Sequence, residues 1–307
     1  VIHYTGKYDP TFLVADGDVL VGMDGDFLPC LWIKGPALLN QRVGRILPKP
    51  GMDRVFAYYY LLKPLKGIEA ATAGTTVKHL SHGDVEDIEL PLPREEEQRA
   101  IATALSDVDA LLGGLDRLIA KKRDLKQAAM QQLLTGQTRL PGFHGEWEVR
   151  RLGSLATCLK GKGLPKSAIV PDGAEPCIHY GELFTRYPEM IGDILSRTNS
   201  TTDSVRSVAN DVLMPTSDVT PRGLAKASCI TVDGVVLGGD ILVIRSSKEL
   251  MCGSFLSYVI RREEDQVLRL VTGSTVYHLY GADMKKFTFS LPPIAEQAAI
   301  VAILSDM

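Results

Sequence analysis

The sequence lacks the features of a membrane, secreted or zinc-bound protein. No apolar run approaches the roughly 20 residues of a membrane-spanning helix, and the N-terminal Val-Ile-His-Tyr is unlike the charged and then apolar start of a signal peptide. The five cysteines are scattered and form no C-x-x-C pair. We therefore expect a cytoplasmic protein without a membrane partner, whose thiols are reduced and mostly buried.

Basic charge is also scarce. The 34 lysines and arginines are outnumbered by 37 aspartates and glutamates, so the formal net charge is -3 at pH 7. Free-standing nucleic-acid binders usually carry a basic excess, which displaces counterions from phosphates. If this chain binds DNA, a partner protein must supply most of the contacts to the phosphate backbone. At 307 residues, with 45% hydrophobic residues, the chain is long enough for about two globular domains.

Catalytic motifs are missing as well. Gly161-Lys-Gly-Leu-Pro-Lys-Ser167 ends like a phosphate-binding loop, but Pro165 stands where that loop needs a glycine with a free N–H. The sequence has no G-x-S-x-G, no H-E-x-x-H and no Asn-Pro-Pro run typical of amino-methyltransferases. We predict no catalytic residue, no metal site and no cofactor in this chain.

One stretch of sequence occurs twice. Gly74-Thr-Thr-Val-Lys-His-Leu80 returns as Gly273-Ser-Thr-Val-Tyr-His-Leu279, a shift of 199 residues (273 minus 74) that continues without a gap to the last residue. The shift places Glu97-Gln98 on Glu296-Gln297. A period this long indicates a repeated domain followed by a helix, and it predicts a pseudo-twofold molecule.

The residues from Arg94 to about Leu134 are rich in good helix formers and predict one long helix. Its apolar residues step by four and three, as in a coiled coil, and form a seam of Ile101, Leu105, Val108, Leu112, Leu115 and Ile119. Either another helix covers this seam, which we favour, or it packs on its own domain. Gly113-Gly114 marks a kink, a close helix crossing or a tolerated weakness.

The flanking sequences predict mainly short strands with a few helices. Val19 to Val21, Cys229 to Val232 and Asp240 to Arg245 are rich in β-branched residues, and a helix is expected near Phe255 to Arg262. The fold class is therefore α+β, with two mixed, mainly β domains joined by the long helix. The first domain has no counterpart of residues 147–199 and the second helix stops at Met307, so we expect a chain shortened at both ends.

The repeated motif, a Leu-Pro pair and then Glu-Gln-x-Ala-Ile at the start of a helix resemble the specificity subunits of type I restriction-modification enzymes. The helix end Gln131-Gln-Leu-Leu-Thr-Gly136, Gly161 to Lys166 and Tyr180-Gly-Glu182 also look typical of that family. The resemblance implies two target-recognition domains and a central conserved coiled-coil helix. Our domain boundaries are 1–93 for the end of the first recognition domain, 94–140 for the helix, 141–292 for the second recognition domain and 293–307 for the start of the second conserved helix.

The resemblance also implies a function and partners. Such a subunit is not an enzyme: it reads a bipartite, asymmetric site in double-stranded DNA and docks two modification (methyltransferase) subunits, and the complex includes restriction subunits. S-adenosylmethionine, ATP and Mg are expected in those partners. The long helix then acts as a ruler between half-sites about one to two DNA turns apart. The alternatives are a coiled-coil interaction scaffold and a non-functional relic of such a subunit.

Base reading requires donors and acceptors on loops that face the major groove. In the first domain the predicted DNA contacts are Asn40, Gln41, Arg42, Lys78 and His79. In the second domain they are Lys160, Lys162, Lys166, Tyr180, Thr216, Ser217, Arg222, Lys226, Tyr277 and His278. We expect His79 and His278 to contact DNA or support structure rather than catalyse a reaction.

Overall fold

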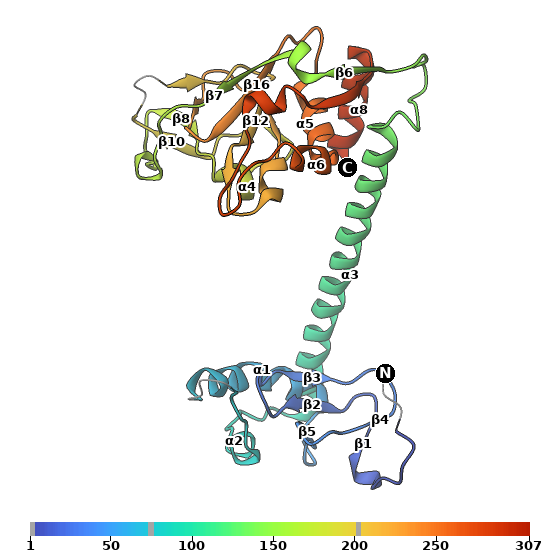
Figure 1. Cartoon of the computed structure of the whole chain (residues 1–307). Coiled ribbons are helices and arrows are strands. Elements are labelled where there is room, and N and C mark those ends of the chain that lie inside the picture. The colour runs from blue at the N-terminus through green and yellow to red at the C-terminus, as the bar shows by residue number, and fades with distance from the viewer. Residues whose placement is uncertain (1–3, 73–76, 201–203) are drawn as a thin grey trace. The chain divides into compact units, whose positions relative to one another are not determined.

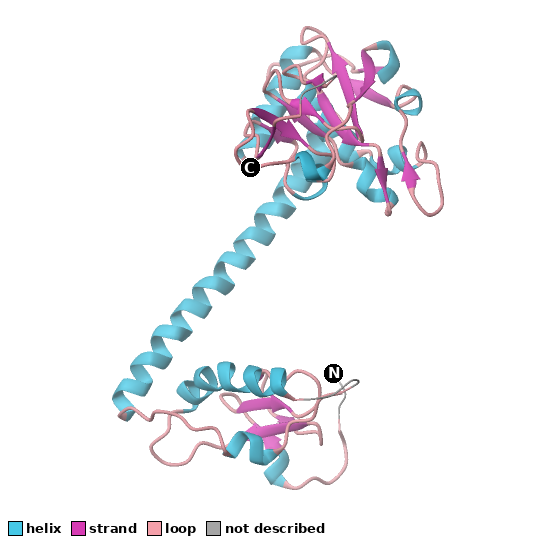
Figure 2. Cartoon of the chain, turned by 90° about the vertical axis from the view of Figure 1, so that its left-hand side faces the viewer, coloured by secondary structure: helices cyan, strands magenta, loops and turns pink. Residues whose placement is uncertain are grey.

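The computed structural model describes residues 4–72, 77–200 and 204–307. It divides into two compact units, residues 1–119 and 120–307, and one helix is continuous across this boundary (Figures 1 and 2). Residues 74–76 of the first repeated motif lie outside the described residues. None of the described helices has the length and apolarity to span a membrane.

Unit 1 is a small sheet covered by one long helix. Its elements are η1 (Pro10–Phe12), β1 (Leu13–Val14), β2 (Val19–Gly22), β3 (Pro29–Leu31), β4 (Ala37–Leu38), β5 (Val43–Ile46), α1 (Arg54–Ala71), α2 (His82–Glu86) and the start of α3 (Glu95–Leu133). The strands form one sheet in the order β3-β2-β5 and a separate pair, β1-β4. Helix α1, which our sequence analysis did not predict, packs its buried Leu61 and Leu65 with Val21 and Phe27.

Unit 2 contains a five-stranded sheet, β7-β16-β12-β14-β9, and a four-stranded sheet, β10-β8-β15-β11. The first half of its elements are β6 (Glu148–Arg151), η2 (Leu152–Ser154), β7 (Ala156–Lys160), η3 (Lys166–Ala168), β8 (Glu175–Ile178), α4 (Glu182–Thr185), β9 (Met190–Ile191), β10 (Ser196–Thr198) and β11 (Val205–Arg206). The second half are β12 (Val212–Pro215), β13 (Ser217–Asp218), η4 (Pro221–Ala225), β14 (Ser228–Ile230), β15 (Val236–Leu237), β16 (Ile241–Ser246), α5 (Gly253–Arg262), α6 (Glu264–Leu268), β17 (Tyr277–His278), α7 (Gly281–Met284), β18 (Thr288–Leu291) and α8 (Ile294–Asp306).

The central strands of unit 2 separate two apolar cores because side chains alternate between the faces of a strand. Val212 and Met214 of β12 pack with α5, α8 and the last turns of α3, whereas Leu213 packs in the cluster on the other face with Ile178 and Leu237. Figure 1 shows α5 and α8 beside the end of α3 in this unit. The main sheet is therefore buried on both faces, which holds its loops in place.

The internal repeat is present in the backbone. The order β3-β2-β5 of unit 1 returns as β14-β12-β16 in unit 2. Gly17 and Asn210, which precede the central strands, both have a positive φ, 89° and 93°. The Gly17 N–H donates to Trp32 O and the Asn210 N–H to Ile230 O, both at 2.8 Å. The predicted α+β fold with two related domains and a long joining helix is confirmed.

A buried glutamine joins each unit to the helix that follows it. Gln98 and Gln297 have no exposed surface. Gln98 Nε2 donates to Gly51 O and Pro93 O, and its Oε1 accepts from the Asp53 N–H, all at 2.8 Å. Asp53 is the N-cap of α1, so this single amide ties the start of α3 to the start of α1.

The same three bonds recur 199 residues later. Gln297 Nε2 donates to Leu250 O at 3.3 Å and Pro292 O at 2.8 Å, and its Oε1 accepts from the N–H of Cys252, the N-cap of α5, at 2.8 Å. The match explains why the glutamine stands at the same place in both sequence copies.

Helix α3 is continuous through Gly113-Gly114, so the glycines are tolerated without a break in the helix. Its hydrogen bonds to α1 come from another face than the apolar seam: Tyr59 Oη lies 2.8 Å from Asp109 Oδ2 and 3.4 Å from Ser106 Oγ. Five seam residues are 40–54% exposed: Leu105, Val108, Leu112, Leu115 and Ile119. The alternative in which the seam packs on its own domain is therefore wrong.

All five cysteines are free, but the expectation that most of them are buried is wrong. Only Cys177 and Cys229 are buried, whereas Cys30 is exposed and the other two are half-buried. Burial raises the pKa of both Cys177 and Cys229 to about 11. These two thiols are therefore almost entirely protonated at neutral pH and unreactive.

Loss of the glutamine amide should destabilise the unit that holds it. In Gln297→Leu the partly buried N–H of Cys252 and two carbonyl groups lose their partner, and we expect the free energy of unfolding of unit 2 to fall by about 2–3 kcal/mol. Urea denaturation followed by circular dichroism measures the loss. The control is Gln127→Leu at an exposed position of α3, and an equally small effect of both substitutions would contradict the assigned role.

The burial of the thiols predicts a simple labelling pattern. With Ellman's reagent at neutral pH, the folded protein should show one fast thiol, Cys30, which disappears in Cys30→Ser. Cys177 and Cys229 should react only after unfolding. Mass spectrometry of the labelled peptides checks the assignment, and label on either buried cysteine in folded protein would contradict it.

Candidate nucleic-acid interface

Both units place a histidine on the same backbone frame. In unit 2, β13 pairs with β17 so that Ser217 lies opposite His278. In unit 1, an isolated antiparallel bridge joins Asp24 and His79. The next backbone bond also matches, because Leu279 N donates to Thr216 O at 3.0 Å and Leu80 N to Met23 O at 2.8 Å. The two histidines of the sequence repeat therefore occupy equivalent positions.

In unit 1 the frame gathers a small polar cluster. His79 Nδ1 lies 2.5 Å from Asp24 Oδ1, and Arg42 Nε lies 3.4 Å from Asp24 Oδ2. The His79 and Arg42 side chains are 73% and 70% exposed. Asn40 Oδ1 accepts from the Arg42 N–H at 2.7 Å, which orders the loop that also carries the exposed Gln41. Four of the five predicted contacts of this unit lie in or beside this cluster.

Lys78 is the exception in unit 1. Its ammonium donates to Glu69 O near the C-terminal end of α1. The carbonyl groups of the last turn carry the negative end of the helix dipole, so they favour a cation there. Lys78 thus stabilises its own unit, and its position does not favour contact with an external phosphate.

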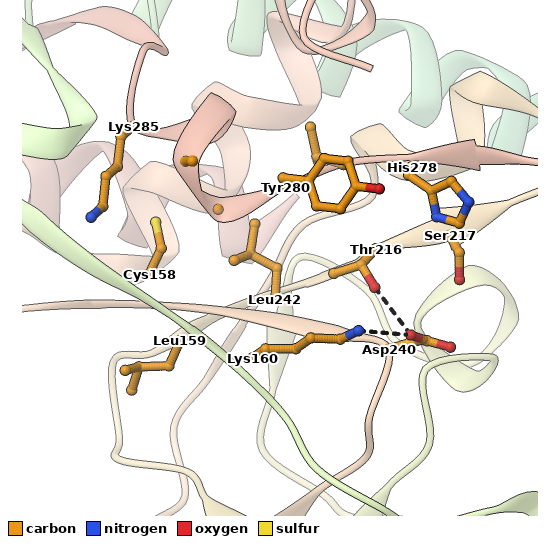
Figure 3. Close-up of a pocket in the computed structure, with 13 residues that line it drawn as sticks. Cys158, Leu159, Lys160, Thr216, Ser217, Asp240, Leu242, His278, Tyr280 and Lys285 are labelled. Atoms are coloured by element: carbon orange, nitrogen blue, oxygen red, sulfur yellow. Dashed lines mark hydrogen bonds and ion pairs between the residues drawn. The ribbon is translucent and has the colours of Figure 1, made fainter. Parts of the chain in front are cut away.

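In unit 2 the equivalent surface is hollowed. Four of the predicted contacts line an open hollow of about 620 Å³: Lys160, Thr216, Ser217 and His278 (Figure 3). Lys160 Nζ lies 3.4 Å from Asp240 Oδ1, and Thr216 Oγ1 lies 3.5 Å from the same oxygen. The structure thus brings together side chains from β7, the end of β12, β13 and β17.

Sequence reasoning missed the charged and aromatic side chains Asp240, Tyr280 and Lys285 of this hollow. Tyr280 is 56% exposed and stacks on His278, with ring centroids 6.1 Å apart and an angle of 24° between the rings. Tyr280 directly follows the repeated motif, so its exposed aromatic ring could have been suspected. Asp240 and Lys285 carry no sequence signal, since only the packing of distant strands brings them here.

The remaining predicted contacts do not line the hollow: Lys162, Lys166, Tyr180, Arg222, Lys226 and Tyr277. Tyr180 packs half-buried on the core beside Phe184, so its ring serves the fold. Arg222 is 81% exposed and reaches Glu264 Oε1 at 3.4 Å on the neighbouring helix α6. Tyr277 lies next to His278 in β17, and Lys166 and Lys226 are exposed on separate turns.

Glycines hold the loop that follows Lys160. A Cβ on Gly161 would overlap the carbonyl oxygen of Gly238, so only glycine permits this close approach. Two residues further on, Gly163 has φ 62° and its carbonyl oxygen accepts from the Gly239 N–H at 2.9 Å. The loop is thereby fastened along residues 237–239, and Lys160 is held at the rim of the hollow.

The hollow carries charged and polar side chains. Burial raises the pKa of the Cys158 thiol in its wall, and nearby Lys285 opposes this shift. Among the residues described, no cluster of three or more His, Cys, Asp or Glu side chains could hold a metal ion. Two lysines, one aspartate, hydroxyl groups, a histidine and a tyrosine offer instead a surface of hydrogen-bond donors and acceptors.

The sequence matches the family described as type I restriction modification DNA specificity domain over residues 3–120 and 144–307. The chain belongs to this family. The two matched segments correspond to the two copies of the repeat, so the resemblance inferred from the repeated motif is confirmed.

The curated relatives are specificity subunits of type I restriction enzymes. The chain is 37% identical over 140 residues to the EcoBI specificity subunit of Escherichia coli, which covers 44% of this chain and 30% of that protein. It is 24% identical over 282 residues to the putative MjaX specificity subunit of Methanocaldococcus jannaschii, covering 86% of this chain and 64% of that protein. The matches thus span between about a third and two thirds of these relatives.

Solved structures confirm the fold. The crystal structure of the type I restriction-modification S subunit from M. genitalium aligns with a TM-score of 0.65 at 18% identity, over 95% of this chain and 77% of that one. A structure described as the basis of complex assembly and conformational transition of the type I system aligns with a TM-score of 0.55 at 19% identity, over 96% of this chain and 74% of that one.

The glycine loop supplies a test of the site's construction. Gly161→Ala forces the loop away from Gly238, so we expect a loss of stability of about 2 kcal/mol or more in unit 2. The control is Gly67→Ala in α1, where a Cβ meets open space and alanine should stabilise by up to about 1 kcal/mol. Urea denaturation measures both, and equal effects would show that the close approach does not restrain the loop.

Proposed function

We propose that this chain reads DNA as the non-catalytic specificity subunit of a type I restriction-modification enzyme, with one half-site for each unit. One observation carries the proposal: the two units share a backbone frame but present different side chains on it. Asp24 in unit 1 stands where unit 2 has Ser217. The Met23 N–H of unit 1 donates to Arg42 O, whereas the equivalent Thr216 N–H of unit 2 donates to Asp240 O.

A shared frame with different side chains suits an asymmetric bipartite target. The frame sets how each unit would approach the groove, and the side chains decide which base edges they pair with. In unit 2, Lys160 and Lys285 are suited to phosphates, whereas Ser217, Thr216 and His278 can donate to or accept from base edges. In unit 1 the equivalent candidates are Asn40, Gln41, Arg42 and His79.

The proposed partners follow from charge and from α3. A net charge of -3 favours an arrangement in which two modification subunits share the phosphate contacts, and the exposed seam of α3 gives a helix surface for assembly. S-adenosylmethionine, ATP and Mg would then belong to the modification and restriction subunits, all in the cytoplasm. With ~1.5 Å per residue, the 39 residues of α3 measure about 58 Å, a suitable spacer between half-sites.

The exposed seam also favours a second candidate, a coiled-coil scaffold or relic that assembles without reading DNA. One experiment separates the two. The full chain is co-purified with type I modification subunits and mixed with random duplex DNA, and the retained DNA is sequenced. Two fixed blocks of bases with a constant spacer support DNA reading. A stable complex that enriches no sequence would leave only the scaffold.

The phosphate role of Lys160 predicts a change in salt dependence. In Lys160→Gln we expect weaker binding to all DNA sequences. The magnitude of the slope of log K against log salt concentration should fall by about 1, which corresponds to one lost phosphate contact. Fluorescence anisotropy from low to moderate salt measures the slope. The control is Lys248→Gln, an exposed lysine of unit 2 outside the hollow, and identical slopes for the two variants would exclude Lys160 from the interface.

A further inference from the structure

One side of unit 1 is open where unit 2 is covered. In unit 2, β16 pairs with β12 on one edge and with β7 on the other, and β18 pairs with β6. In unit 1, β5 corresponds to β16 but pairs only with β2 among the described residues. Residues 89–92, the counterpart of β18 after the shift of 199, form no strand. In the described residues of unit 1, β5 and residues 89–92 thus lack the neighbouring strands that β16 and β18 have in unit 2.

Beside β5 and α2 lies an open hollow of about 590 Å³ with apolar side chains in its wall and charged ones at its margin. Its wall includes Val21, Ile46 and Val85 from β2, β5 and α2. Their counterparts in unit 2 are Met214, Ile244 and Met284, and in that unit Leu152 and Leu155 pack in the same apolar cluster. These leucines come from η2 and the residue after it, between β6 and β7, and are 0% and 8% exposed. The hollow of unit 1 therefore corresponds to a place that two leucines fill in unit 2.

A carboxylate at the same side of unit 1 also lacks its partner. Glu296 of unit 2 is fully buried and accepts from Arg139, with Nε–Oε1 and Nη2–Oε2 both at 2.7 Å, while Trp147 Nε1 lies 3.2 Å from Oε2. Glu97 is its copy in the repeat. It is exposed and has no hydrogen bond or ion pair within the described part of the chain.

The backbone of unit 1 can accept the missing strand. Leu152 N donates to Phe287 O at 2.8 Å, and Thr288 N turns away to Gln266 Oε1. Because bonded and non-bonded positions alternate in an antiparallel pair, the N–H at Ser290 also points away from β6. Pro91 occupies the position of Ser290 in unit 1, so its missing N–H would cost no bond to a docked strand.

One difference restricts what can dock. His82 stands where unit 2 has Gly281, and a Cβ at Gly281 would lie 2.8 Å from the Cβ of Cys158. A strand on β5 therefore needs glycine, which has no Cβ, at the position that corresponds to Cys158.

We propose that this side of unit 1 is a docking surface for a polypeptide segment with the pattern of residues 139–160, supplied from outside residues 1–307. An arginine of that segment would pair with Glu97, a tryptophan eight residues later would pack beside it, and a first strand would add to residues 89–92. Two leucines would fill the hollow, and a second strand with a glycine opposite His82 would add to β5. The surface is inferred from the repeat alone. The docked second strand would correspond to β7, whose Cys158, Leu159 and Lys160 line the hollow of unit 2.

The test uses the full chain and a fluorescent peptide of residues 135–162 that carries Cys158→Gly. Anisotropy titration should show saturable binding with one peptide per chain. Glu97→Gln in the chain, or Arg139→Leu in the peptide, should each weaken binding by at least about tenfold, the loss of roughly one charged pair. The matched control is Glu96→Gln, an exposed glutamate of the same helical turn, and it should bind like the original chain.

Hydrogen exchange locates the bound peptide. We expect new protection at residues 43–46 and 88–92, and a peptide that keeps Cys158 should bind at least about tenfold better to His82→Gly than to the original chain. The proposal is overturned if the folded chain binds no peptide, or if Glu96→Gln and Glu97→Gln weaken binding equally. If protection changes only at 241–246 and 288–291, the peptide has replaced the matching strands of unit 2, and the proposal is overturned. The proposal is also overturned if the free chain forms a dimer that already protects 43–46, because a second copy would then occupy the edge of β5.

Discussion

The hydrogen bonds of one buried amide decide how each unit connects to the helix after it. Gln98 and Gln297 each satisfy the N–H at the N-cap of one helix and two loop carbonyl groups. Without this amide three polar groups, most of them partly buried, would lose their partner, which destabilises the fold. The geometry of both helix starts, and therefore of everything that α3 and α8 present, depends on this interaction.

The two units share the same backbone arrangement but present different side chains on it. Backbone bonds of the sheet and the bridge to the histidine repeat between units, because they involve N–H and C=O groups that every residue except proline offers. The side chains at the rim are free to differ. Asp24 binds His79 in unit 1, whereas Asp240 attracts Lys160 in unit 2. A duplicated recognition unit can thus keep its fold while its chemistry diverges.

Sequence patterns predicted those helices and strands that form because of the residues within them. Helix α3 follows from its composition and from the proline before it, and β2, β16 and α5 follow from β-branched or apolar runs. Helix α1 was missed because Pro64 lies in its interior and a proline there usually breaks a helix. The burial of Leu61 and Leu65 against the sheet holds the helix together across that proline, and no local pattern reveals this tertiary contact.

The sequence alone determined the duplication, the long helix and the family, since repeated motifs and helix propensity are properties of neighbouring residues. It also named both histidines and Lys160. Only the tertiary structure decided that Lys78 turns inward to Glu69, that Asp240, Tyr280 and Lys285 join the candidate interface, and that the seam of α3 remains exposed. Those outcomes depend on which strands and helices meet across long sequence separations, and register and packing, rather than local pattern, set such contacts.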